Sequence, residues 1–216
     1  MLATRLMGAT ASVLSGVELV DIQAVSSGAS ITLNLGTYQA DRVLVFGCYV
    51  RTAPTNGFPS TLEVNGSAVA TIGTNTSGAS GYLYGISTTT GTSCTFQPTA
   101  TTSIDGYLVA VWAVYGVLAG SFSASAQSES ASATSRTASV ATAGDVLFAI
   151  TLGARTNVAL NMGTNGFVDS SQTTLVTGLG TTFYCFAGHR LPSSTAAVTS
   201  SQSPSGALNL YIASAT

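Results

Sequence analysis

The sequence predicts an all-β protein, an antiparallel β-sandwich of jelly-roll type, and three observations support this fold class. First, 23 of the 216 residues are Gly, and no long window has apolar residues at the i, i+3, i+4 and i+7 spacing of an amphipathic helix. Second, apolar or alternating runs bounded by turn residues recur about every ten residues, as in sandwiches and barrels. Third, the second half of the chain repeats the pattern of the first.

The first half contains a series of predicted strands. Alternating apolar and polar residues predict a strand at 30–35, and nearly continuous apolar residues predict an internal strand at 42–50. Residues 61–72 place Asn65-Gly66 between two short alternating runs, which is the strongest short-range signal for a β-hairpin. The remaining strands predicted before residue 100 are at 81–88 and 93–98.

The most apolar stretch is GYLVAVWAVYGVLAG at residues 106–120, which could be a membrane span, a buried helix or a buried strand. It is shorter than the roughly 20 apolar residues that a spanning helix needs. Its many Val, Tyr and Trp residues favour a pleated sheet, and both of its alternating sets of side chains are apolar. The stretch is therefore predicted to be a central strand that is covered on both faces.

Residues 121–142 have the low-complexity sequence SFSASAQSESASATSRTASVAT. Such a composition is typical of a disordered linker. Small residues alternate with Ser through much of the segment, however, so a thin, solvated edge strand is an equal alternative. No domain boundary is placed here.

Five segments of the first half have counterparts in the second half, in the same order. The matches are 41–47 with 144–150, 55–58 with 164–167, 61–64 with 173–176, 82–87 with 183–188, and 105–112 with 205–212. Two such halves could form two small sandwiches, or two Greek keys interlocked in one jelly roll. We favour one domain over residues 25–216, with halves at about 25–120 and 141–216, because a larger domain buries proportionally more surface.

Charged residues are rare, at 6% of the chain against about 25% in ordinary globular proteins. There are six Arg, no Lys and eight acidic residues, and the arginines are scattered singly. Nucleic-acid binding needs clustered Lys and Arg, so we expect none. A chain with so few charges suits a permanent part of an assembly, in which much of the surface is covered, although a soluble secreted protein remains an alternative.

The three cysteines, Cys48, Cys94 and Cys185, have no CxxC spacing and lie in apolar or Thr-rich strand patterns. We interpret them as small buried hydrophobic residues in a protein that folds in a reducing cytoplasm. One disulfide with a spare thiol is the alternative.

The N-terminus has an Arg followed by only two apolar residues before Gly8, which is too short for the core of a signal peptide. We therefore expect the protein to be made and assembled in the cytoplasm. Residues 1–24 are predicted to be an N-terminal arm, which either docks on a neighbour or is disordered.

No catalytic or metal-binding motif is present, and we expect no enzymatic activity, no cofactor and no metal. His189 is the only histidine, and a base would need a partner such as Asp41, Asp145 or Asp169. Without a GxSxG or HExxH motif, a strand-end or loop histidine is the better interpretation. The matching positions of Asp41 and Asp145 before core strands indicate hydrogen bonds to turn backbone.

Aromatic residues permit a carbohydrate-binding alternative. Rings at Tyr82, Tyr84, Phe58 and Phe167 near turns or alternating strands could stack on sugars if they are exposed. The commoner role of such residues is cross-strand pairing within a sheet.

The segments ADRVLVFGCYV, STLEVNGSAVATIG, GYLYGIST, DGYLVAVWAVYGV and TAGDVLFAITLG form an ordered pattern over residues 40–153. This pattern resembles a group of β-sandwich virion structural proteins of tailed bacteriophages and phage-like particles. The opening TRLMGATA is similar to the start of many small phage tail or fibre proteins.

The resemblance implies a non-enzymatic virion component, a capsid spike or fibre, decoration or tail protein, that is located in the virion and acts by oligomeric assembly and display. Its partners would be copies of itself and other virion proteins, with a host surface glycan as a possible further ligand, and with no nucleic acid and no membrane insertion. Arg5, Leu6, Met7 and Leu14 would be the docking residues of the arm. The alternative is a carbohydrate-binding or host-receptor recognition module.

Overall fold

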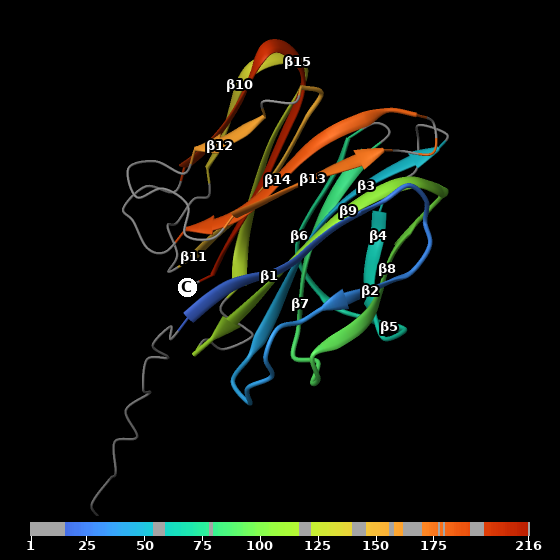
Figure 1. Ribbon diagram of the computed structural model, residues 1–216, viewed down its shortest axis with the longest axis vertical. Coiled ribbons are helices and arrows are strands. Elements are labelled where there is room, and N and C mark those ends of the chain that lie inside the picture. Colours follow the sequence, from blue (N-terminus) through green and yellow to red (C-terminus); the bar gives the residue numbers. More distant parts are fainter. Residues whose placement is uncertain are drawn as a thin grey trace, which may run out of the picture.

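The computed structural model describes residues 16–53, 59–77, 80–116, 122–139, 146–155, 158–161, 170–176, 178, 180–190 and 197–215. The regular structure of these residues consists of β-strands in antiparallel sheets, which confirms the predicted all-β class (Figure 1). The strand β1 begins at Gly16, so the segment predicted as an arm is too long: residues from Gly16 onward belong to a sheet.

A five-stranded sheet with the order β1-β9-β3-β7-β6 forms the middle of the molecule. Its strands are β1 (Gly16–Val25), β3 (Val43–Ala53), β6 (Ala70–Ser77), β7 (Ser80–Ser87) and β9 (Ser103–Tyr115). Both faces of β9 are buried from Asp105 to Val114, as predicted for the most apolar stretch of the chain. The β-branched and aromatic side chains of β9 and β3 alternate between two separate cores, which explains why neither strand shows an exposed polar face.

A four-stranded sheet with the order β2-β8-β4-β5 covers one face of the middle sheet. Its strands are β2 (Ile31–Asn34), β4 (Pro59–Val64), β5 (Ser67–Ala68) and β8 (Ser93–Ala100). The β4–β5 hairpin turns at Asn65 and Gly66, as the sequence predicts, and their φ values of 52° and 75° are those of a type I′ turn. Phe46 of β3 stacks on Phe96 of β8 between the two sheets, with ring centroids 5.6 Å apart.

A third sheet covers the other face of the middle sheet and has the order β10-β15-β11-β14-β13, with β12 also paired to β15. Its strands are β10 (Phe122–Ser139), β11 (Val146–Gly153), β12 (Ala159–Asn161), β13 (Ser170–Val176), β14 (Thr182–Arg190) and β15 (Ala197–Ala215). The low-complexity segment is therefore an edge strand, the second of the two alternatives.

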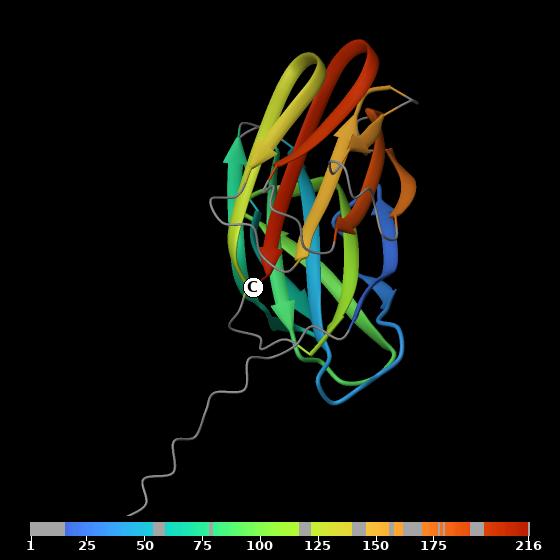
Figure 2. The same cartoon turned by 90° about the vertical axis from the view of Figure 1, so that its left-hand side faces the viewer.

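The paired strands β10 and β15 extend beyond this sheet and fold back over its outer face (Figure 2). The pairing register shifts on both sides of Ala133, where the strands bend. The buried amide of Gln202 holds the bend, because its Nε2 donates to the carbonyls of Ala133, Gly206 and Ala207 at 3.0, 2.8 and 3.1 Å. Past the bend, Ala138 and Val198 pack on the outer face of the third sheet.

Three of the five predicted segment matches correspond to a repeat of strand order, because they pair β3 with β11, β7 with β14 and β9 with β15. The match of 61–64 with 173–176 is wrong, because it pairs β4 of the four-stranded sheet with β13, whose counterpart by strand order is β6. The match of 55–58 with 164–167 lies outside the described residues. The middle and third sheets have corresponding strands in the same order: β1 corresponds to β10, β9 to β15, β3 to β11, β7 to β14 and β6 to β13. The register refines the match: Val45 lies opposite Trp112 and Phe148 lies opposite Ala213, so the counterpart of Trp112 is Ala213, one residue beyond the sequence match. Each half keeps its strands in its own sheets, and the strands of the two halves are not interleaved.

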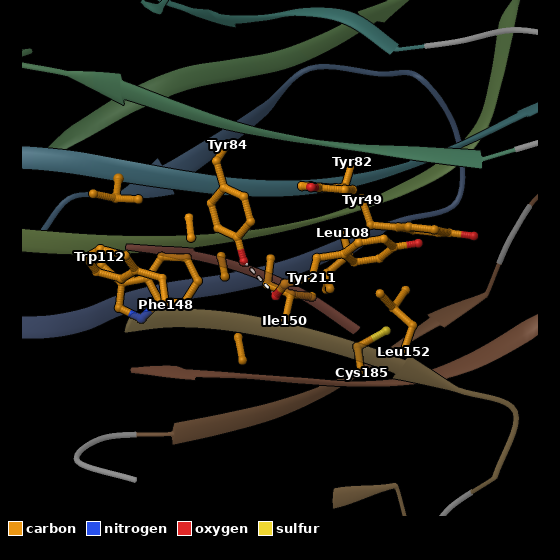
Figure 3. Close-up of a cluster of buried hydrophobic side chains, with 14 of the residues drawn as sticks. Tyr49, Tyr82, Tyr84, Leu108, Trp112, Phe148, Ile150, Leu152, Cys185 and Tyr211 are labelled. Carbon is orange, nitrogen blue, oxygen red and sulfur yellow. Dashed lines mark hydrogen bonds between the residues drawn. The ribbon is translucent and has the colours of Figure 1, made fainter. Parts of the chain in front are cut away.

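The two halves share the central core, which lies between the middle and third sheets (Figure 3). Aromatic rings from both halves meet there: Tyr82 contacts Tyr211 with ring centroids 4.4 Å apart, and Trp112 contacts Phe148 at 5.3 Å. Such contacts stabilise the pairing of the halves in addition to the area that they bury.

Candidate functional site

The single histidine is buried. His189 lies at the next-to-last position of β14, opposite Phe148 of β11, and has no exposed surface. It follows the alternation of Cys185 and Ala187, which belong to the central core. The strand-end position is as predicted, but the imidazole is enclosed within the protein.

Of the three acidic residues considered as partners of His189, the structure describes Asp41. The Oδ2 of Asp41 accepts a hydrogen bond of 3.1 Å from the backbone N–H of Gly116, which is the turn-stabilising role predicted for this residue. Asp145 and Asp169 lie outside the described residues.

The most extensive polar site is formed by Arg42, which the sequence showed only as one scattered arginine. Its side chain is buried, and its guanidinium joins the β2–β3 and β7–β8 connections. Nη1 donates to the carbonyls of Leu35 and Thr37 at 2.8 and 3.2 Å, and Nη2 donates to those of Thr89 and Gly91 at 2.9 and 2.7 Å. The guanidinium therefore satisfies backbone acceptors where the chain leaves the sheets.

A second charged site lies where the two halves meet. The Nε of Arg51 in β3 is 3.5 Å from the Oδ2 of Asp105 in β9, and the Asp105 side chain is almost completely buried. The guanidinium of Arg51 also lies over the ring of Phe183, which belongs to the second half, at 5.7 Å. The backbone N–H of Gly178, from the second half, donates to the Asp105 carbonyl at 2.8 Å. These groups link the halves and leave little of the carboxylate accessible to a substrate.

The aromatic residues proposed as a sugar platform are not available for stacking. Tyr82 and Tyr84 are buried in the central core, so the alternative of ordinary packing within the sheets is correct for both. Phe58 and Phe167 lie outside the described residues.

All three cysteines are buried free thiols, as the sequence predicts. Burial raises the pKa of Cys94 to about 11 and that of Cys185 to about 12, and it also raises the pKa of Cys48. A thiol acts as a nucleophile or metal ligand only as the thiolate, so these positions do not suit thiolate chemistry at neutral pH.

An open groove of about 330 Å³ lies at the corner where the chain passes from β5 to β6. It is lined by small aliphatic and hydroxyl side chains, and no ionisable or aromatic residue is among them. The lining residues are Val64, Ser67, Ala68, Val69, Ala70, Ile86, Ser87, Thr88 and Thr89. Its wall is rigid, because Ser87 and Thr89 join their hydroxyls at 2.7 Å and the Thr89 carbonyl binds Arg42.

The predicted docking residues Arg5, Leu6, Met7 and Leu14 lie outside the described part of the chain. Within that part, no three His, Cys, Asp or Glu residues are grouped so that they could hold a metal ion. The described residues also contain no helix that is long and apolar enough to cross a membrane.

Asp41 and Arg42 bind backbone atoms, and Arg51 binds Asp105, so the role that these charged groups support is to hold the sheets and their connections in place. The groove has the shape of a binding site, and its neutral hydroxyl lining suits hydrogen bonding to a neutral ligand. In comparisons with known proteins, no family model, no curated protein and no solved structure matches the chain.

Proposed function

We propose that this chain is a non-enzymatic structural component of a bacteriophage virion, a spike, fibre, decoration or tail protein that acts by homo-oligomeric assembly and surface display. The observation that carries the proposal is the use of the charged groups. Buried Arg42 binds carbonyls of two connections between sheets. Half-buried Arg51 pairs with buried Asp105 where both contact the second half, through Phe183 and Gly178, so these charges stabilise a rigid block.

The strand order supports a virion setting for this block. In the first half, β1-β9-β3-β7 and β2-β8-β4-β5 have the order expected of an eight-stranded jelly roll, and we propose that fold for this half. The second half would be a related, shorter version, in which the folded-back ends of β10 and β15 with β12 replace the covering sheet. Jelly rolls are common in viral capsid proteins and also in lectins.

The composition agrees with assembly. A surface with few charges gains little solubility from electrostatic repulsion, and closed oligomers cover part of such a surface. In the virion, the partners would be other copies of the chain and neighbouring virion proteins.

The test is the mass of the purified protein in solution, measured by light scattering with and without residues 1–15. The deletion ends before Gly16 so that β1 remains complete. We expect a discrete oligomer for both forms, with the arm needed only for binding to another virion protein. A monomer at every protein concentration in both forms would contradict the proposal.

The second candidate function is recognition of a neutral glycan, and the hydroxyl-lined groove favours it. A glycan array with the intact protein tests this function. Binding that is lost in Ala68→Trp, which would fill the groove, and kept in Thr32→Trp on the exposed face of β2 would support a lectin.

A further inference from the structure

The strand β10 forms one end of the third sheet and pairs with β15 alone among the described strands. It has 18 residues, against about 5–6 in a typical strand. An edge strand presents a row of backbone N–H and C=O groups on its free side, and these groups can pair with a strand of another chain.

The segment of this edge from Ala124 to Ser130 has little of the usual protection against such pairing. Natural edge strands are commonly interrupted by charged residues, proline or bulges. From Ala124 to Ser130, β10 pairs with β15 without a register shift, and Glu129 is the single charged residue of this segment. The irregularities of β10 lie outside this segment, between Phe122 and Ala124, between Ser130 and Ala133, and between Ala133 and Ser135. The middle of the edge is therefore regular and nearly uncharged.

The middle sheet ends on the same side of the molecule in a similar strand. β6 lies against β10, forms the end of its own sheet, and has no charged residue between Ala70 and Ser77. On the opposite side, the middle sheet ends in β1, which contains Glu18, Asp21 and a register shift between Leu19 and Asp21. β6 has its own register shift between Thr71 and Gly73, so its regular and uncharged stretch runs from Gly73 to Ser77, on the same side of the molecule as β10.

We infer that the β10 edge is the contact at which a second copy of this chain adds, by antiparallel pairing of β10 with β10 of the copy. The inference rests on the proposed function, since it names the surface through which the assembly forms. A two-fold axis perpendicular to the sheets makes the contact self-complementary and places β6 beside its own copy. The third sheet then continues from one subunit into the other.

The sequence of β10 accommodates this pairing when the two-fold axis passes between Gln127 and Gln127 of the copy. The register position of Ala124 is then opposite that of Ser130 of the copy, and the position of Glu129 is opposite that of Ser125, so the two glutamates do not share a register position. Like charges directly opposite each other in antiparallel strands are destabilising. The register at Gln127 avoids this repulsion.

The test uses charge complementation at the predicted two-fold axis. In Gln127→Lys and in Gln127→Glu, two like charges would face each other, whereas an equimolar mixture would pair Lys with Glu. We expect light scattering to give a smaller mass for each variant alone and the wild-type mass for the mixture. Thr174→Lys, an exposed position on β13 at the other end of the same sheet, is the matched control and should keep the wild-type mass.

A second measurement does not depend on the folding of the variants. Hydrogen exchange of the wild-type protein should show that the alternate amides between Ala124 and Ser130 that point away from β15 become protected as the protein concentration and the mass increase. An oligomer that is unaffected by both variants, and in which these amides exchange at the same rate at all concentrations, would overturn the β10 contact and leave the proposed assembly function intact. A wild-type protein that is monomeric throughout would overturn both.

Discussion

The phenol of Tyr84 donates a hydrogen bond of 3.0 Å to the backbone carbonyl of Tyr211 (Figure 3). Tyr84 belongs to β7 of the first half, Tyr211 belongs to β15 of the second, and both side chains are buried. The contact is a polar link within an otherwise apolar core, and its geometry is satisfied only when the two sheets are correctly aligned. It therefore specifies how the halves pack as well as stabilising them.

Replacement of Tyr84 by Phe tests the contribution of this link. The ring is kept, but the buried carbonyl of Tyr211 loses a donor, so we expect the free energy of unfolding to fall by about 1–2 kcal/mol in urea titrations. Tyr115→Phe is the control, because the Tyr115 hydroxyl donates to Thr37 at an exposed site. An equal loss in both variants would contradict the special role of the link between the halves.

Replacement of Arg42 by Lys should be much more costly than its conservative chemistry suggests. An ammonium group cannot reach carbonyls of both connections in the planar fork of a guanidinium, so several buried acceptors would lose their donors. We expect a loss of about 3 kcal/mol or more in the free energy of unfolding. Arg155→Lys removes an exposed guanidinium with one bond to the Ser205 carbonyl and should change stability by less than about 0.5 kcal/mol.

Replacement of Gly47 by Ala should destabilise the protein, because the added methyl group would crowd the central core. A Cβ at this position would lie 2.7 Å from Ile150 and from the ring of Tyr84, and 3.1 Å from Trp112. These side chains come from three different strands, so none can move without disturbing the others, and we expect a loss of about 1–3 kcal/mol. Gly16→Ala, whose added Cβ would meet Tyr115 at an ordinary 3.7 Å, is the control for the same substitution. Thermal unfolding that is equal in both variants would disprove the crowding.

The sequence predicts the strands of this fold well and the positions of its polar groups poorly. The burial of β9 on both faces and the Asn65-Gly66 turn follow from local signals, namely apolar alternation and turn chemistry. The order of the strands within each sheet depends on long-range pairing, which the pseudo-repeat indicates only by matching segments. The predicted match of β9 with β15 is wrong by one residue at Trp112. Both alternating sets of side chains in β9 are apolar, so no polar face fixes the alignment.

The roles of Arg42 and Asp105 could not be predicted from the sequence for a different reason. Each depends on connections that are distant in the chain, such as Thr89 and Gly91 for Arg42. One signal was present: Arg42 directly precedes a strongly apolar strand, where a charged side chain needs compensating partners. The aromatic residues were ambiguous because Tyr suits both a buried strand and an exposed sugar platform, and only burial distinguishes the two.

The buried thiols make the stability of the protein dependent on alkaline pH. The pKa values of Cys94 and Cys185 rise from 9.0 to about 11 and about 12, because burial disfavours the thiolate in the folded state. The unfolded chain therefore releases these protons at a lower pH than the folded chain does. The resulting stability is fully present below about pH 9 and is lost as the pH rises toward 11 and 12, at up to about 1.4 kcal/mol per pH unit for each thiol.

Urea titrations at a series of pH values between about 8 and 10 measure this effect before the tyrosines contribute strongly. We expect the free energy of unfolding to decrease across the interval for the wild type, and the double variant Cys94→Ala/Cys185→Ala to show a smaller decrease, with Cys48 accounting for part of what remains. Alanine also leaves cavities, so the comparison is between slopes with pH and not between absolute stabilities. Equal slopes would mean that these two thiols ionise at the same pH in the folded and unfolded chains, and hence that they are not enclosed between the sheets as the structure places them.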